Sequence, residues 1–213
     1  MRLFRRRPRY DRRATLDEAT REERRGRPKR AIALYRRVLA VEPGNVELHS
    51  RLAPLLAETG QSFDAWLSFR TVARAHMRRK ALDQALAVWR RAAAALPDRV
   101  ETWLAVARLE RRLGREQRAV DALLAGRRRL HRRRQRSEAI HLLCEARQVR
   151  PWDADLVIDL AELLSASKRR PEAEDLLDAL AGRTGGAMRR RVRAVQWRIA
   201  PSLSRAWLWL RAA

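Results

Sequence analysis

The sequence contains a single cysteine, Cys144, and 25 acidic residues against 49 basic ones. One cysteine excludes an intramolecular disulfide and a cluster of thiolate metal ligands. No apolar run approaches the roughly 18 residues of a membrane span, and the basic N-terminal stretch lacks the apolar segment of a signal peptide. These absences favour a cytoplasmic protein in a reducing compartment.

Motifs that carry catalysis are missing as well. The chain has no glycine-rich dinucleotide or phosphate loop, no HExxH motif and no serine in a nucleophile elbow. Its four histidines, His49, His76, His131 and His141, show no metal-ligand spacing with carboxylates or with Cys144. We therefore expect a protein that is not an enzyme and that uses neither a metal nor a cofactor.

Positive charge is what the chain has in excess. The formal net charge is +24, and nearly all of it is arginine, because the only lysines are Lys29, Lys80 and Lys168. Such a field attracts polyanions, whether nucleic acid, anionic lipid or an acidic protein. A composition rich in arginine, alanine and leucine also results from GC-rich coding, so both explanations of the charge stay open.

Three similar segments recur with a constant period of 54, and each ends in proline. They are AIALYRRVLAVEP at 31–43, ALAVWRRAAAALP at 85–97 and AIHLLCEARQVRP at 139–151. Two further series keep the same step, beginning at Val46, Val100 and Ala154 and at Ala65, Ala119 and Ala173. Three series in one register indicate an internal repeat.

Each repeated segment has the apolar spacing of a helix. One face of the segment from Val46 carries four leucines at i, i+4, i+7 and i+8, namely Leu48, Leu52, Leu55 and Leu56. Gly60 and Gly114 stand where helices are expected to end. No window has the alternating, β-branched pattern of a strand. The sequence predicts an all-α chain of about eleven helices, three in each unit.

Residues within the units resemble those of the tetratricopeptide-repeat family. Trp103, Ala107 and Ala119 match its early Trp, the small residue where helices touch and the central Ala. A second set matches the central Ala, the aromatic position, the next small residue and the closing Pro: Ala85, Trp89, Ala92 and Pro97. The family period is about 34 residues rather than 54, so a helix near 61–77 is expected to be shared between motifs.

The resemblance covers about Leu16 to Ala181. It implies a right-handed α-solenoid of stacked antiparallel helices that acts as a scaffold for protein–protein interactions. In such an array Trp66, Trp89 and Trp103 are expected to pack in the core. Glu110 departs from the family by standing where it has an aromatic residue.

The run GRRRLHRRRQR, residues 126–136, contains seven arginines. One and two periods before Arg132-Arg133-Arg134, the chain has Arg78-Arg79-Lys80 and Arg24-Arg25-Gly26. We call these three segments the basic elbows and expect them to align along one side of the solenoid as a basic ridge. The partner-binding residues predicted there are Arg78, Arg79, Lys80, Arg132, Arg133 and Arg134.

Three interpretations of the ridge stay open. It is a solvated surface, a surface for an acidic protein, or a surface for nucleic acid or anionic lipid. The absence of interleaved aromatic residues for base stacking weighs against nucleic acid.

The sequence predicts three parts: a basic disordered arm (1–14), the solenoid (15–182) and a C-terminal extension with a short Trp-rich helix (183–213). Trp207, Trp209 and Leu210 are expected either to anchor the chain to a partner or to cap the last repeat. The predicted function is a scaffold or adaptor that holds an acidic or helical partner segment. The alternative is a nucleic-acid-binding solenoid that uses the ridge and the arm, and the oligomeric state stays open.

Overall fold

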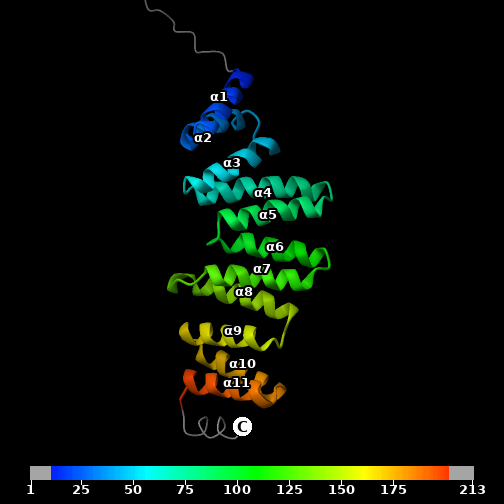
Figure 1. Cartoon of the computed structure of the whole chain (residues 1–213), viewed down its shortest axis with the longest axis vertical. Coiled ribbons are helices and arrows are strands. Elements are labelled where there is room, and N and C mark those ends of the chain that lie inside the picture. Colours follow the sequence, from blue (N-terminus) through cyan, green and yellow to red (C-terminus); the bar gives the residue numbers. More distant parts are fainter. Residues whose placement is uncertain (1–10, 202–213) are drawn as a thin grey trace, which may run out of the picture. The chain divides into compact units, whose positions relative to one another are not determined.

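The computed structural model describes residues 11–201, and this part of the chain is all α (Figure 1). It contains eleven α-helices, one short 3₁₀ helix and no strand within the described residues. The chain divides into two compact units, Met1–Leu96 and Pro97–Ala213. The prediction of an all-α helical repeat is confirmed.

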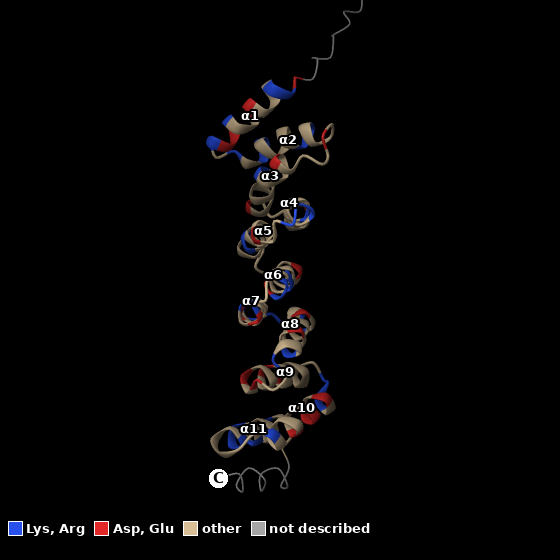
Figure 2. Cartoon of the chain, turned by 90° about the vertical axis from the view of Figure 1, so that its right-hand side faces the viewer, with Lys and Arg blue, Asp and Glu red and all other residues tan. Residues whose placement is uncertain are grey.

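Helices adjacent in sequence pack against each other within each unit. The first unit contains α1 (Arg12–Arg24), α2 (Pro28–Leu39), α3 (Val46–Glu58), α4 (Ser62–Arg78) and α5 (Leu82–Ala95). The second contains α6 (Val100–Arg112), α7 (Glu116–Arg129), η1 (Arg133–Gln135), α8 (Arg136–Val149), α9 (Ala154–Ala166), α10 (Arg170–Arg183) and α11 (Gly186–Ile199). In the second unit α6, α8 and α10 form one layer, and α7, α9 and α11 the other (Figure 2).

The helix starts recur with the period of the sequence repeat. Three sets of starts keep this step: Pro28, Leu82 and Arg136; Val46, Val100 and Ala154; Ser62, Glu116 and Arg170. Each unit of the repeat is therefore three helices long. Because α4 packs against both α3 and α5, it is shared by two helical hairpins.

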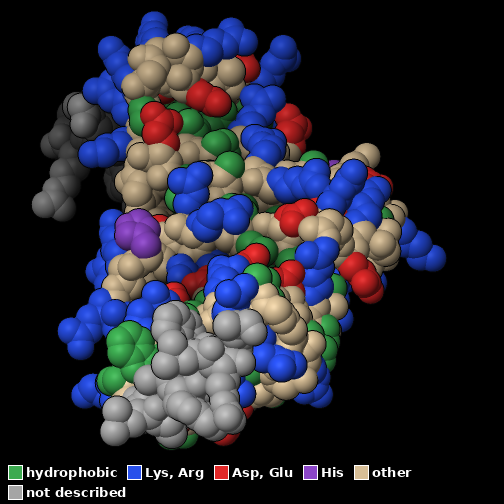
Figure 3. Space-filling model, turned by 60° about the horizontal axis from the view of Figure 1, so that its bottom comes forward, with side chains coloured by type: hydrophobic (Ala, Val, Ile, Leu, Met, Phe, Trp, Pro, Cys, Tyr) green, Lys and Arg blue, Asp and Glu red, His purple; other side chains and the backbone are tan. Residues whose placement is uncertain are grey.

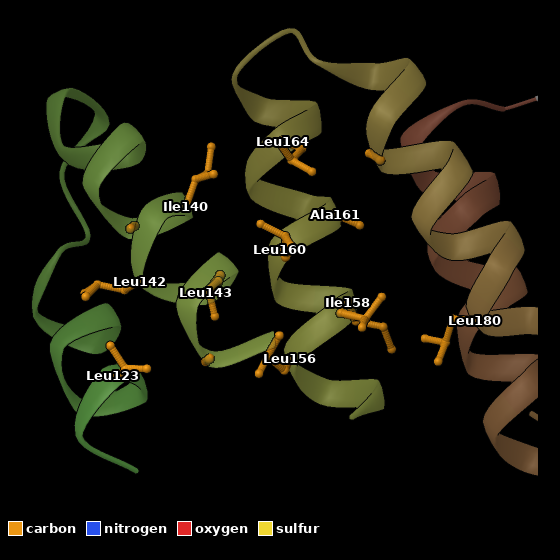
Figure 4. Packing of buried hydrophobic residues seen from close by; sticks show 14 of the residues in the cluster. Leu123, Ile140, Leu142, Leu143, Leu156, Ile158, Leu160, Ala161, Leu164 and Leu180 are labelled. Carbon is orange, nitrogen blue, oxygen red and sulfur yellow. The ribbon is translucent and has the colours of Figure 1, made fainter. Parts of the chain in front are cut away.

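The core of the second unit is made by leucine and isoleucine side chains that converge between α7, α8, α9 and α10 (Figure 4). Leu143, Leu160 and Leu180 are at most 1% exposed. Ala161 is fully buried beside them, and its small side chain lets neighbouring helices approach closely. Burying this apolar surface is the main stabilising contribution, because a single helical hairpin cannot cover its own apolar face.

The three tryptophans expected in the core differ in burial. Trp89 is buried at 7% exposure, whereas Trp66 and Trp103 are only half-buried. Glu110 is buried at 1% exposure, with Arg115 Nη1 4.0 Å from its carboxylate. A charged side chain therefore occupies the position that holds Leu56 in the preceding copy.

The boundaries predicted between the arm, the solenoid and the extension, after residues 14 and 182, both fall inside helices, α1 and α10. Residue 15 lies inside α1, which begins at Arg12. Beyond residue 182, α11 packs on α9 and α10. Two ion pairs, Arg191–Asp155 and Arg198–Glu162, join α11 to α9.

The helix α11 is thus part of the packed array of the second unit. Residues 1–10 and the predicted anchor residues Trp207, Trp209 and Leu210 lie outside the described residues. Among the described helices, none combines the length and the apolar character needed to cross a membrane.

Helices α3, α6 and α9 end through a residue in the left-handed conformation. The first two use glycine, Gly60 at φ 78° and Gly114 at φ 72°, as the sequence predicts. The third uses Lys168 at φ 66°. The following amide closes each end, as where Arg169 N donates to the Leu164 carbonyl oxygen at 2.9 Å.

Replacing Lys168 with glycine is expected to raise the free energy of unfolding by about 1 kcal/mol, because a Cβ atom is unfavourable in this conformation. Chemical denaturation followed by circular dichroism measures the change. Lys168→Ala removes the same charge but keeps the Cβ atom, so it should show no such gain. Equal stability of the two variants would contradict the explanation.

Candidate interaction surfaces

The second basic elbow joins α4 to α5. Arg78, Arg79 and Lys80 are all exposed, and Lys80 adopts a left-handed φ of 59° that reverses the chain. Within residues 11–201 none of the three forms an ion pair with a carboxylate. Their positive charges are therefore available to a partner.

The first basic elbow differs because one of its two arginines, Arg25, is paired with an acidic residue of α1. Glu22 is 7% exposed, and its carboxylate lies 3.1 Å from Arg25, 3.5 Å from Arg27 and 3.7 Å from Arg30. Desolvation raises the pKa of Glu22, but the hydrogen bonds and charges of these arginines together lower it below its ordinary value. Arg25 therefore uses its charge inside the first unit.

The order of the helices also corrects the expected alignment of the elbows. Neighbouring helices joined by short turns run antiparallel, so successive turns alternate between the two edges of the array. The first and second basic elbows are three turns apart, and both belong to the first unit. They therefore lie at opposite edges, and a repeat with an odd number of helices does not stack them into one ridge.

The arginine run at 126–136 has both structural and exposed members. Arg127 Nη2 donates to Asp159 Oδ1 at 2.7 Å, and Arg136 Nη1 donates to the Ala166 carbonyl oxygen at 2.7 Å. Leu130, at 2% exposure, inserts into the core between them. The exposed remainder of the run, which forms no ion pair within the described residues, is Arg128, Arg129, Arg132, Arg133 and Arg134.

The acidic residues of the second unit are largely used within it. Figure 2 shows acidic residues on α9 and α10. Asp155, Asp159 and Glu162, on one side of α9, are paired with arginines of α11, α7 and α11 respectively. Basic side chains are spread over the face shown in Figure 3. Positive charge therefore remains after the internal ion pairs have formed.

A cleft of about 500 Å³ in the second unit was missed by sequence reasoning. It is lined by Arg108, Arg111 and Arg112 of α6 and by Glu116 of α7. The three arginines are exposed, and none forms an ion pair within residues 11–201. Comparison of the repeat copies could have found them, because the equivalent positions hold Pro54, Ala57 and Glu58 in one copy and Glu162, Ser165 and Ala166 in the other.

An exposed apolar strip lies on α4 in the first unit. Phe63 is 60% exposed and Leu67 is 36% exposed. The ring of Phe63 lies 5.8 Å from that of Trp66, and the Arg70 guanidinium lies 4.4 Å from the Trp66 ring. The positions that correspond to Phe63 and Leu67 in the next copy are polar, so that copy lacks the strip.

Cys144 is exposed on α8, although it directly follows two apolar residues that would favour a packed position. Its neighbours Leu142 and Leu143 face the core, whereas position 144 lies on the outer side of the same helix turn. Desolvation raises the pKa of the Cys144 thiol and outweighs Arg147 and Arg169, which lower it. The thiol is therefore a poor nucleophile at neutral pH.

No group of three His, Cys, Asp or Glu side chains in residues 11–201 is arranged to hold a metal ion. The surfaces that carry chemistry in this part of the chain are thus the basic elbows, the arginine-lined cleft and the apolar strip of α4.

Two family models match the chain, and both describe a tetratricopeptide repeat. One matches residues 12–55 and the other residues 130–195. Together the matched ranges span just over half of the 213 residues. No curated protein sequence matches the chain.

The solved structures that match this chain have low sequence identity to it. A tetratricopeptide-repeat protein from Parabacteroides merdae is 13% identical, with 94% of this chain and 91% of that chain covered and a TM-score of 0.34. A thermophilic one from Thermus thermophilus is 16% identical, with coverages of 95% and 88% and a TM-score of 0.32. The Pseudomonas aeruginosa protein pilF is 14% identical, with coverages of 94% and 88% and a TM-score of 0.31.

Proposed function

Because this chain belongs to the tetratricopeptide-repeat family, we propose that it is a non-enzymatic scaffold that holds an acidic segment of a partner protein. The observation that carries the proposal is the set of exposed basic side chains without a carboxylate partner. At the second and third elbows these are Arg78, Arg79, Lys80, Arg132, Arg133 and Arg134. The helical repeats supply a surface, and its charge selects the kind of segment that it holds.

The unpaired arginines repel one another in the free protein. The basic residues of each elbow are consecutive in sequence, and charges of one sign held this close destabilise the compact state through their repulsion. A partner that brings carboxylates removes this cost and adds charge-assisted hydrogen bonds, which arginine makes in bidentate geometry. The long-range field also speeds the encounter with an acidic segment.

The second and third elbows favour a protein partner over nucleic acid. Neither 78–80 nor 132–134 contains an aromatic residue. Single-stranded nucleic acids are held by aromatic platforms as well as by charge. Members of this family also usually bind other proteins.

Fluorescence anisotropy with the full-length chain tests the proposal. The probes are an acidic peptide of about a dozen residues, acetylated and amidated, and a single-stranded RNA of similar length, titrated from about 50 to 300 mM salt. We expect the peptide to bind more tightly than the RNA at about 150 mM salt. A peptide with glutamine in place of glutamate serves as the control.

Tighter binding of the RNA, with a steep loss of affinity as salt rises, would instead support the nucleic-acid alternative, because phosphate contacts release counterions. Equal binding of the acidic and glutamine peptides would contradict the proposed role of charge.

A further inference from the structure

We propose that the cleft lined by Arg108, Arg111, Arg112 and Glu116 is the site that holds the carboxylate side chains of the partner's acidic segment. This inference rests on the proposed function and assigns it a location. The basic elbows attract the segment through their charge, and the cleft of the second unit binds its carboxylate side chains directly.

The geometry of α6 brings three guanidinium groups to one place. Residues at i, i+3 and i+4 lie on the same side of a helix, about 5–6 Å apart at their Cβ atoms. Arg108, Arg111 and Arg112 have this spacing, and all three line the cleft. The cleft is wide open to solvent, so the three guanidinium groups are accessible to carboxylate side chains.

These arginines are not needed by the fold. The next arginine along the chain, Arg115, lies 4.0 Å from the buried Glu110 and is therefore used internally. Arg108, Arg111 and Arg112 are exposed and form no ion pair within the described residues. The positive charges that line the cleft are thus not used in ion pairs within the second unit.

The arginine cluster is also particular to one copy of the repeat. A general bias toward arginine codons would place arginine without regard to the copy. The position of Arg108 holds proline one copy earlier and glutamate one copy later. At the positions of Arg111 and Arg112 the other copies have alanine, glutamate or serine. The middle copy therefore differs from the other two by three arginines that lie on one side of the same helix.

The presence of Glu116 in the lining favours a peptide over a polyphosphate. The carboxylate of Glu116 repels phosphate groups. It can only accept hydrogen bonds, and ionised phosphates have no N–H or O–H group to donate to it. A peptide supplies backbone N–H groups next to its acidic side chains. A segment with spaced carboxylates can therefore satisfy the three arginines and Glu116 together.

The test compares two triple variants that lose the same charge from the second unit. The cleft variant is Arg108→Gln, Arg111→Gln and Arg112→Gln. The matched control replaces three exposed arginines of the second unit that lie outside the cleft and the basic elbows and form no ion pair within the described residues: Arg128→Gln, Arg129→Gln and Arg190→Gln. Binding of the acidic peptide to the full-length chain is measured by anisotropy at about 150 mM salt. Circular dichroism establishes that both variants keep their helical content.

We expect the cleft variant to weaken binding about tenfold or more, because charge-assisted contacts are lost. The control variant should weaken it less than about threefold, because it loses only long-range attraction. Equal weakening by both variants would overturn the inference and leave the acidic-partner proposal standing. If the unaltered chain does not bind the peptide, the proposed function itself fails.

A charge exchange gives a second, independent readout. Arg111→Glu should weaken binding of the acidic peptide and favour a peptide in which one glutamate is replaced by lysine. Recovery with the lysine peptide would place the peptide's side chain at Arg111. Failure of every single glutamate-to-lysine peptide to recover binding would count against a direct contact there.

Discussion

Replacing Gly126 with alanine is expected to destabilise the second unit by about 1–3 kcal/mol, because overpacked cores carry a cost of this size. A Cβ atom at this position would lie 2.5 Å from Trp103 Cγ and 2.9 Å from Trp103 Cβ. The first distance is far inside van der Waals contact. Glycine is therefore required where α7 crosses the base of the Trp103 side chain on α6.

Trp103 has little freedom to move away from the added methyl group. Its indole Nε1 donates to the Pro97 carbonyl oxygen at 2.9 Å, and the clash falls near its Cβ atom rather than at a flexible end. Alanine is favoured over glycine within a helix by roughly 0.5–1 kcal/mol. The steric cost exceeds this gain, so the sign of the effect is a loss of stability.

Chemical denaturation followed by circular dichroism measures the loss, with Gly182→Ala as the matched control. Gly182 lies on α10, is exposed and has no atom within 4 Å of an added Cβ. That variant should gain up to about 1 kcal/mol from helix propensity. A gain of similar size for Gly126→Ala would show that α6 and α7 are not held as closely as described.

Replacing Leu130 with alanine is expected to cost about 2–4 kcal/mol, since Leu130 is an almost fully buried leucine whose removal leaves a cavity. Leu130 is 2% exposed and belongs to the core cluster of the second unit. It lies between arginines that are exposed, Arg129 before it and Arg132 after it. The substitution therefore removes the apolar contact that holds the third basic elbow to the core.

Two control variants separate packing from charge at this elbow. Leu130→Met keeps most of the volume and should cost less than about 1.5 kcal/mol. Arg129→Ala, at an exposed neighbour, should change stability by no more than about 0.5 kcal/mol. If Leu130→Ala cost as little as Arg129→Ala, the elbow would not be anchored through Leu130.

The sequence by itself determined the helices and their repeat. Helix formation follows from apolar spacing and end signals within about a dozen residues, and such local patterns are visible in the chain. The equivalence of Val46, Val100 and Ala154 could thus be seen before any contact was known. Each of them is the first residue of a helix. Gly60 and Gly114 were identified as helix ends for the same local reason.

The burial of single side chains was less accessible to sequence reasoning. Cys144 follows two buried leucines and yet is exposed. Each residue of an α-helix turns about 100° from the last, so one position can leave the buried face. Neighbouring helices then decide which side is covered. The pattern of α8 alone did not specify that side at residue 144.

Only the tertiary structure decided which arginines are available to a partner. Arg127 of α7 forms an ion pair with Asp159 of α9, and Arg191 of α11 forms one with Asp155, which also lies on α9. Such pairs depend on helices brought together by packing, which no local pattern encodes. The edge at which each elbow lies was likewise set by the antiparallel order of the helices, and the cleft of α6 by the stacking of its neighbours. The repeat could be predicted from the sequence because helix formation depends on residues close together in the chain. The available surfaces depend on contacts between residues far apart in the chain, so only the tertiary structure determined them.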